Sequence, residues 1–142
     1  MRRIICVGNS LVPEDACGLR VLELLRQRKL PAGVEVLDGG LAGLDLLNQM
    51  DDARRVAFVD RVAGFTEPGR CVLLRAAEVA AQAGDYGDHS SGLSYLLRIL
   101  PQVVPSPPAV AVIGIEGRGS EPDWHRAAAL AVHWVTADCE DW

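Results

Sequence analysis

The side chains of this sequence that could do chemistry are acids and one imidazole, placed after short apolar runs or in a polar loop. Two carboxylates and an imidazole suit a borderline divalent ion such as Ni²⁺ or Zn²⁺. The carboxylates would balance its charge, and three protein ligands would leave positions open for water or a substrate group. The candidates are Asp15 with Glu14 beside it, Asp38, Asp60 and His89.

Each candidate also has a purely structural interpretation, which the sequence leaves open. Glu14 and Asp15 could be acids of a first helical turn that face the positive end of the helix dipole. Asp60 could cap a turn after its strand, and Asp38 could belong only to the turn made with its two glycines. His89 lies in a polar loop and could be an ordinary surface histidine.

The elements that must position these residues alternate along the chain. Short apolar runs bounded by turn residues predict buried strands, and apolar spacing of three and four predicts helices between them. The connection between the third and fourth strands is about ten residues long, too short for a parallel crossover, so the fourth strand is expected to be antiparallel. The predicted strands are 3–7, 34–37, 55–59, 71–74 and 109–115, and the predicted helices are 13–29, 42–49, 93–100 and 122–137.

This alternation predicts an α/β fold with a mostly parallel five-stranded sheet and helices on both faces, in one domain over residues 1–142. Ligands of such sheets bind at the carboxyl ends of the strands. Asp15, Asp38 and Asp60 all follow strands at that end. His89 completes the set only if its loop, which follows the fourth strand, returns to the same edge.

Composition narrows the possible functions. The 142 residues are 49% hydrophobic and 23% charged, which is typical of a globular protein, and a net charge of −5 argues against a broad nucleic-acid footprint. No apolar run is long enough to cross a bilayer. The four cysteines have no CxxC spacing and are expected to be reduced thiols in the cytoplasm. The sequence has no dinucleotide or P-loop motif, no HExxH and no nucleophile triad.

Taken in order, these segments resemble the hydrogenase maturation endopeptidases, which process the large subunit of nickel–iron hydrogenases. The resemblance covers residues 3 to about 136 and departs from the family at Cys6, where the family usually has glycine. The residues that carry it are Val7-Gly8-Asn9-Ser10-Leu11, Glu14-Asp15-Ala16-Cys17-Gly18, Leu37-Asp38-Gly39-Gly40 with Gly43, Val59-Asp60, and His89 with Gly92-Leu93.

The resemblance implies a twisted, three-layer sheet fold and a site that completes the coordination of nickel presented by the large-subunit precursor, without a tightly held metal of its own. The implied metal ligands are Asp15, Asp60 and His89, with Glu14 in reserve for Asp15. Asp15 and Asp60 are also the implied catalytic residues. Residues that would contact the substrate chain are Asn9, Asp38, Gly39 and Gly40.

The implied reaction is removal of the precursor's C-terminal extension after nickel insertion, by a cytoplasmic and monomeric protein. Two mechanisms stay open: nickel acting as a Lewis acid, or an aspartate acting as general base in an aspartyl-type endopeptidase. Two other functions compete with this one. The chain could be a docking or quality-control protein that binds the large subunit without cleaving it, or the fold could serve another hydrolase or a phosphorylase.

Overall fold

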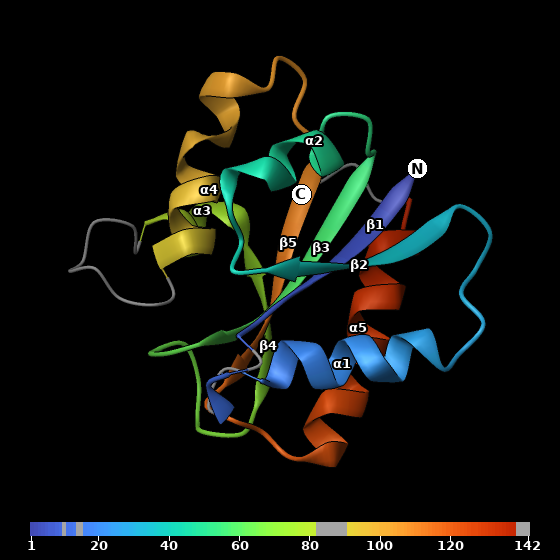
Figure 1. Cartoon of the computed structure of the whole chain (residues 1–142), viewed down its shortest axis with the longest axis vertical. Helices are drawn as coiled ribbons and strands as arrows, with labels where there is room; N and C mark the ends of the chain where they lie inside the picture. The colour runs from blue at the N-terminus through green and yellow to red at the C-terminus, as the bar shows by residue number, and fades with distance from the viewer. Residues whose placement is uncertain (10, 14–15, 82–90, 139–142) are drawn as a thin grey trace.

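The computed structural model describes residues 1–9, 11–13, 16–81 and 91–138. Its centre is one five-stranded sheet with the order β2-β1-β3-β5-β4, twisted from one edge to the other (Figure 1). The three strands at the middle of the sheet are almost wholly buried, as their apolar sequences predict. The strands are β1 (Arg2–Val7), β2 (Val34–Gly40), β3 (Arg55–Val62), β4 (Cys71–Arg75) and β5 (Ala109–Glu116).

Four of the five strands are parallel. β1 pairs in parallel with both β2 and β3, β3 pairs in parallel with β5, and β4 runs antiparallel to β5 at the sheet edge. The antiparallel orientation confirms the expectation drawn from the short connection before this strand. The fold class is therefore the predicted one.

Helices cover both faces of the sheet and divide the core into two clusters. α1 (Cys17–Arg26) and α5 (Glu121–Thr136) pack on one face, where their alanine, leucine and valine side chains meet the inward residues of β1, β3 and β5. The opposite face is covered by η2 (Leu44–Leu46), α2 (Leu47–Met50), α3 (Ala76–Ala80) and α4 (Ser91–Val103). Among the described residues, no helix is both long and apolar enough to cross a membrane.

Several elements begin or end elsewhere than predicted. β3 continues to Val62 because its last three residues pair with β5, so Asp60 lies inside the strand and not after it. Helix α1 begins at Cys17 and not at Pro13, and it has no acid in its first turn. Glu14 and Asp15 lie outside the described residues, so their interpretation as acids that face the helix dipole stays open. The short helix α3, directly after β4, was not predicted.

Candidate functional site

The carboxyl ends of three neighbouring strands meet at one edge of the sheet. Cys6 of β1 lies between Asp38 of β2 and Val59 of β3, and Val7 is paired with Gly40. The chain leaves β1 toward the face covered by α1, and it leaves β2 toward the face covered by α2 (Figure 1). Open parallel sheets form their binding crevice where successive connections diverge in this way.

Asp60 is the acid at the centre of this edge. It is paired with Gly114 of β5, and it follows Val59, the last residue of β3 that pairs with β1. The side chain is half-buried, and its Oδ1 accepts a 2.8 Å hydrogen bond from the backbone N–H of Arg61. Asp60 therefore has β5 beside it on one side. On its other side, the pairing of β3 with β1 has already ended at Val59.

The loop after β1 is a tight turn built on Asn9. The side-chain Oδ1 of Asn9 accepts a hydrogen bond from the backbone N–H of Leu11 at 2.9 Å, and its carbonyl accepts one from Val12 at 3.1 Å. The N–H of Gly8 donates to the carbonyl of Gly40 at 2.9 Å, which ties this loop to the end of β2. Asn9 therefore holds the turn after β1 in its conformation. Its contact with substrate stays a prediction.

The end of β2 is equally constrained, and β2 continues to Gly40, so Asp38 lies inside the strand and not after it as predicted. The Oδ1 of Asp38 accepts a hydrogen bond from the N–H of Gly40 at 2.9 Å, and Gly40 has a positive φ of 54°. A Cβ on Gly39 would lie 2.6 Å from a methyl group of Ile5, so the backbone of β2 approaches β1 closely here. Ala42 holds a φ of 59°, which a non-glycine residue adopts only at a cost in free energy.

Helix α1 packs against the same edge through a glycine. A Cβ on Gly18 would lie 2.0 Å from the carbonyl oxygen of Val7 and 3.2 Å from that of Val59. Only a residue without a side chain allows the first turn of α1 to rest on the last residues of β1 and on the residue before Asp60. The first turn of α1 is therefore held at the end of β1 and at Val59 of β3.

Helix α4 meets the edge from the other face in the same manner. A Cβ on Gly92 would lie 2.7 Å from the carbonyl oxygen of Leu41, in the loop after β2. The loop after β3 is held too, because Glu116 at the end of β5 accepts hydrogen bonds from the N–H groups of Gly64 and Phe65, at 2.6 and 3.3 Å. Sequence reasoning missed Glu116, although a lone acid at the end of an apolar run is the signal that could have found it.

Three of the predicted site residues, Asp15, Glu14 and His89, lie outside the described residues. Their side-chain positions, and hence the metal-ligand set, stay predictions. The predicted residues that the structure does describe, Asp60 with Asn9 and the Asp38–Gly40 turn, come together at one edge. Among the residues that the structure describes, no three His, Cys, Asp or Glu side chains are grouped as a metal site.

A small cavity of about 90 Å³ lies on the α1 side of this edge, next to the segment from Pro13 to Cys17. It is also lined by Arg20, Arg118 and Trp124. The Arg20 guanidinium carbon lies 5.8 Å from the centre of the Trp124 ring, and the indole N–H donates to the Arg118 carbonyl at 3.1 Å. The lining of this cavity therefore combines two basic residues with one aromatic ring.

Cys6 and Cys71 are not activated as nucleophiles. Burial raises the pKa of the Cys6 thiol, and burial also raises the pKa of Cys71. Both therefore stay protonated at neutral pH, whereas catalytic cysteines react as thiolates. Cys6, Cys17 and Cys71 are free thiols.

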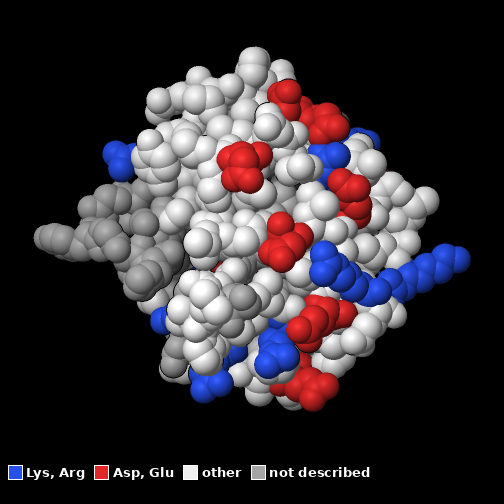
Figure 2. All heavy atoms as spheres, viewed as in Figure 1, with Lys and Arg blue, Asp and Glu red and all other residues white. Residues whose placement is uncertain are grey.

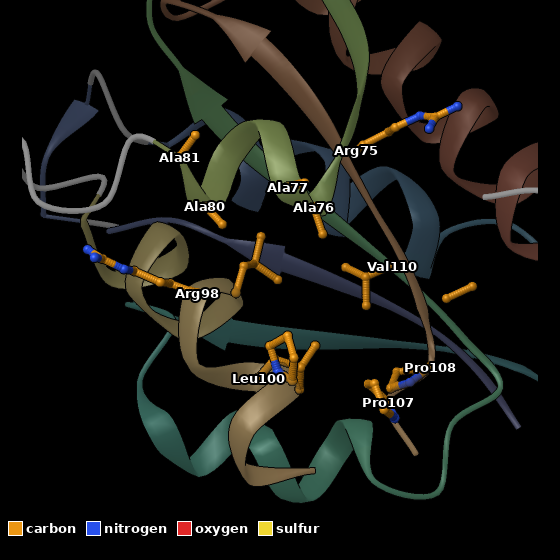
Figure 3. A pocket seen from close by; sticks show the side chains of 13 residues that line it. Arg75, Ala76, Ala77, Ala80, Ala81, Arg98, Leu100, Pro107, Pro108 and Val110 are labelled. Carbon is orange, nitrogen blue, oxygen red and sulfur yellow. The ribbon is translucent and has the colours of Figure 1, made fainter. Parts of the chain in front are cut away.

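A larger cavity of about 630 Å³ lies at the other end of β5, between α3 and α4 (Figure 3). Its walls are alanines, prolines and leucines together with Arg75 and Arg98, and none of its lining residues is an acid, a histidine or a cysteine. It therefore offers no general base and no anionic metal ligand. The carboxyl edge of the sheet is the candidate site.

Comparison with known proteins identifies the family. A family model described as hydrogenase maturation protease matches residues 19–133. The chain belongs to the hydrogenase maturation protease family. Its members are endopeptidases, so the protein is assigned as a hydrolase.

Individual relatives agree with this assignment. The hydrogenase 2 maturation protease of Escherichia coli K12 is 34% identical over 122 residues, which cover 84% of this chain and 74% of that protein. The hydrogenase expression/formation protein HupD of Bradyrhizobium diazoefficiens is 30% identical over 85% of this chain and 64% of its own length. The solved structure of the E. coli hydrogenase maturating endopeptidase HybD superposes with a TM-score of 0.73 at 31% identity, covering 95% of this chain and 90% of that one.

Proposed function

We propose that this protein removes the C-terminal extension of a nickel–iron hydrogenase large-subunit precursor after nickel has been inserted. Membership of the maturation protease family supports the reaction, and the names of the relatives supply the substrate. The observation that carries the proposal is the meeting of three strand ends at the carboxyl edge. There Asp60 lies beside the end of β1, and the glycine-packed starts of α1 and α4 approach from opposite faces.

The glycine contacts are the reason to place Asp15 and His89 in the same crevice as Asp60. Asp15 precedes Gly18 by three residues, and Gly18 rests on Val7 and Val59. His89 precedes Gly92 by three residues, and Gly92 rests on Leu41. A chain spans at most about 3.5 Å per residue, so the Cα atoms of Asp15 and His89 belong within about 10.5 Å of the Cα atoms of Gly18 and Gly92.

In this proposal the nickel ion arrives with the substrate. Asp15, Asp60 and His89 complete its coordination, and two carboxylates with one imidazole are ligands that Ni²⁺ accepts. Only a precursor that carries nickel would then bring its scissile peptide bond to the carboxylates. The ion would supply Lewis-acid chemistry at the scissile carbonyl or at an attacking water, or an aspartate of this set would act as general base. Glu14 is the substitute ligand for Asp15.

We also propose the domain organisation, the oligomeric state, the location and the substrate-contacting residues of the protein. The whole of residues 1–142 acts as one domain, as a monomer, and in the cytoplasm, where reduced thiols such as Cys6, Cys17 and Cys71 are the rule. The backbone of the Asp38–Gly40 turn and Asn9 line the path of the substrate chain, because the two glycines allow another backbone to come close.

The experiment is cleavage of purified nickel-loaded precursor, followed by mass spectrometry of the product. We expect Asp60→Asn, Asp15→Asn and His89→Ala each to lower the cleavage rate by a factor of roughly 10²–10⁴, the size of an acid–base or ligand contribution. Asp45→Asn is the matched control, since Asp45 is an exposed acid just past the loop after β2 that the proposal leaves out. The Asp45→Asn variant should cleave the nickel-loaded precursor at the wild-type rate.

Two results would contradict the proposal. Unchanged cleavage by Asp60→Asn would remove that residue from the site. Binding of the precursor by the wild-type protein without any shortened product would instead favour a docking or quality-control protein. Precursor that lacks nickel should not be cleaved, and equal cleavage of that form would refute the role given to the metal.

A further inference from the structure

The surface around the crevice exposes an unusual share of apolar side chains. Seven large hydrophobic residues are exposed among those that the structure describes, and four of them lie on the segments that follow β1 and β2. Leu11 is 88% exposed and Val12 36% in the loop after β1, while Leu41 is 70% and Leu44 51% exposed just after β2. Leaving leucines this exposed costs free energy that a bound partner would recover.

The four residues form two opposed rims. The loop with Leu11 and Val12 leads to the face of α1, and the segment with Leu41 and Leu44 leads to the face of α2, so the strand ends lie between them (Figure 1). Figure 2 shows the molecule from the same side, with its acidic and basic side chains marked. We call these four residues the apolar clamp.

The backbone that carries the clamp is held in place without any partner. The Asn9 side chain fixes the N–H of Leu11, and Gly92 of α4 packs on the carbonyl of Leu41. Ala42 holds its left-handed conformation immediately after Leu41. Binding would therefore lose little backbone entropy, which is how a preorganised surface gains affinity.

The size of the clamp indicates what occupies it. Even complete burial of four side chains falls well below the roughly 800 Å² per partner that a stable protein–protein interface buries. It is too small to be the face of a stable dimer, but it suits one extended peptide segment. Successive side chains of an extended chain point to opposite sides, so neighbouring residues of a segment in the crevice would meet opposite rims.

We propose that the apolar clamp binds apolar side chains of the precursor's C-terminal extension, just after the scissile bond, and thereby places that bond over Asp60. This inference rests on the proposed function, because it takes the substrate from it. The clamp is a binding element and touches no reacting atom. Its loss should weaken binding and leave the chemical step intact.

The test uses the full chain with Leu11→Ser, Leu41→Ser and the double variant, and nickel-loaded precursor as substrate. Each single variant should raise KM roughly tenfold, the effect of losing one buried leucine side chain, with kcat near the wild-type value. Val103→Ser is the matched control, because Val103 is 52% exposed on α4, far along the chain from both loops. It should change neither constant.

A binding arm separates this inference from the proposed function. In the inactive Asp60→Asn background, the dissociation constant for the precursor is measured with and without each leucine substitution, by biolayer interferometry. A tenfold loss of affinity supports the clamp even if the wild-type chain never cleaves the precursor. Affinity that stays within twofold of the Val103→Ser value overturns it, whatever happens to cleavage.

Two further arms test the occupant. Mature large subunit, which lacks the extension, should bind the leucine variants and the wild type equally. An equal loss of affinity for the mature form would show that the clamp contacts the body of the subunit, and this overturns the assignment to the extension. Size-exclusion chromatography should give one elution volume for all variants, and a change on substitution would identify a second copy as the occupant instead.

Discussion

The replacement of Gly18 by alanine tests how the fold positions the proposed site. In an exposed helix this change usually stabilises, by about 1 kcal/mol, because alanine restricts the unfolded chain and favours the helix. Gly18 is buried against the end of β1, and the added Cβ would lie 2.0 Å from the carbonyl oxygen of Val7. The structure therefore predicts the opposite sign.

The size of the effect follows from that distance. Carbon and oxygen atoms in contact lie more than 3 Å apart, so the start of α1 must move by about 1 Å, and the atom that it meets is backbone, which cannot turn away. Overpacking of this kind costs about 1–3 kcal/mol, which lowers the melting temperature of a chain of this length by roughly 3–10 °C. A displacement of 1 Å near a reacting centre costs about 10²-fold in rate.

The assay measures thermal unfolding by circular dichroism and cleavage of nickel-loaded precursor by mass spectrometry, on the same preparations. Gly43→Ala is the control. Gly43 lies near the same edge with a φ of −69°, which alanine adopts freely, and its added Cβ would meet only the flexible carboxylate of Asp45. The control should unfold and cleave like the wild type.

Wild-type behaviour of Gly18→Ala would refute the reasoning. A melting temperature within about 1 °C and a cleavage rate within twofold would mean that α1 does not rest on the carbonyl of Val7 in solution. The glycine contact would then no longer argue that Asp15 lies beside Asp60. A loss of stability with full activity, measured well below the melting temperature, would separate the packing of α1 from the position of the acids.

The remaining predictions concern Gly92 at the start of α4 and the ion pair between Arg3 and Asp52. Gly92→Ala should slow cleavage, because the added Cβ would lie 2.7 Å from the carbonyl oxygen of Leu41 and would displace the start of α4. Thermal unfolding and precursor cleavage are measured as for Gly18→Ala. Arg3 donates hydrogen bonds to Asp52, which lower the pKa of that carboxyl group in the folded protein. The stabilisation that this bond gives is present above the unfolded-state pKa of about 4 and is lost as the pH falls through the lower folded value. Asp52→Asn should therefore lower the melting temperature at pH 7, and the difference should vanish in acid; a constant difference down to pH 2 would contradict this.

Hydrophobic pattern and connection length were enough to predict the strands, the layers and the one antiparallel pair. These features depend on local sequence and on the rule that parallel strands need a long crossover. The carboxyl edge followed from the same rule, so Asp38 and Asp60 were placed at one end of the sheet correctly. The position of Asp60 inside β3 was not predictable, because the strand is extended by pairing with β5, which is more than fifty residues away.

The start of α1 shows a different limit. The proline and two acids at 13–15 are typical of a first helical turn, and on that pattern the helix was expected to begin at Pro13. It begins at Cys17, and the residue that it places against the sheet is Gly18. Local propensity cannot report a contact with the carbonyl of Val7, because that contact exists only once the strand and the helix have packed.

The glycines of this sequence, more than its acids, indicate how the crevice is built. Gly18 and Gly92 bring two helix starts from opposite faces of the sheet onto the ends of the strands, and Gly40 lets the chain turn out of β2. Each contact is made by backbone, so the space between them is left to side chains: Asp60 in the middle and the exposed leucines at the rims. A protease whose substrate is a folded protein with an extended tail needs a site that another chain can enter. Under the proposed function, the leucine rims and Asp60 would therefore form one binding surface, and the precursor-binding assays on the leucine variants test this.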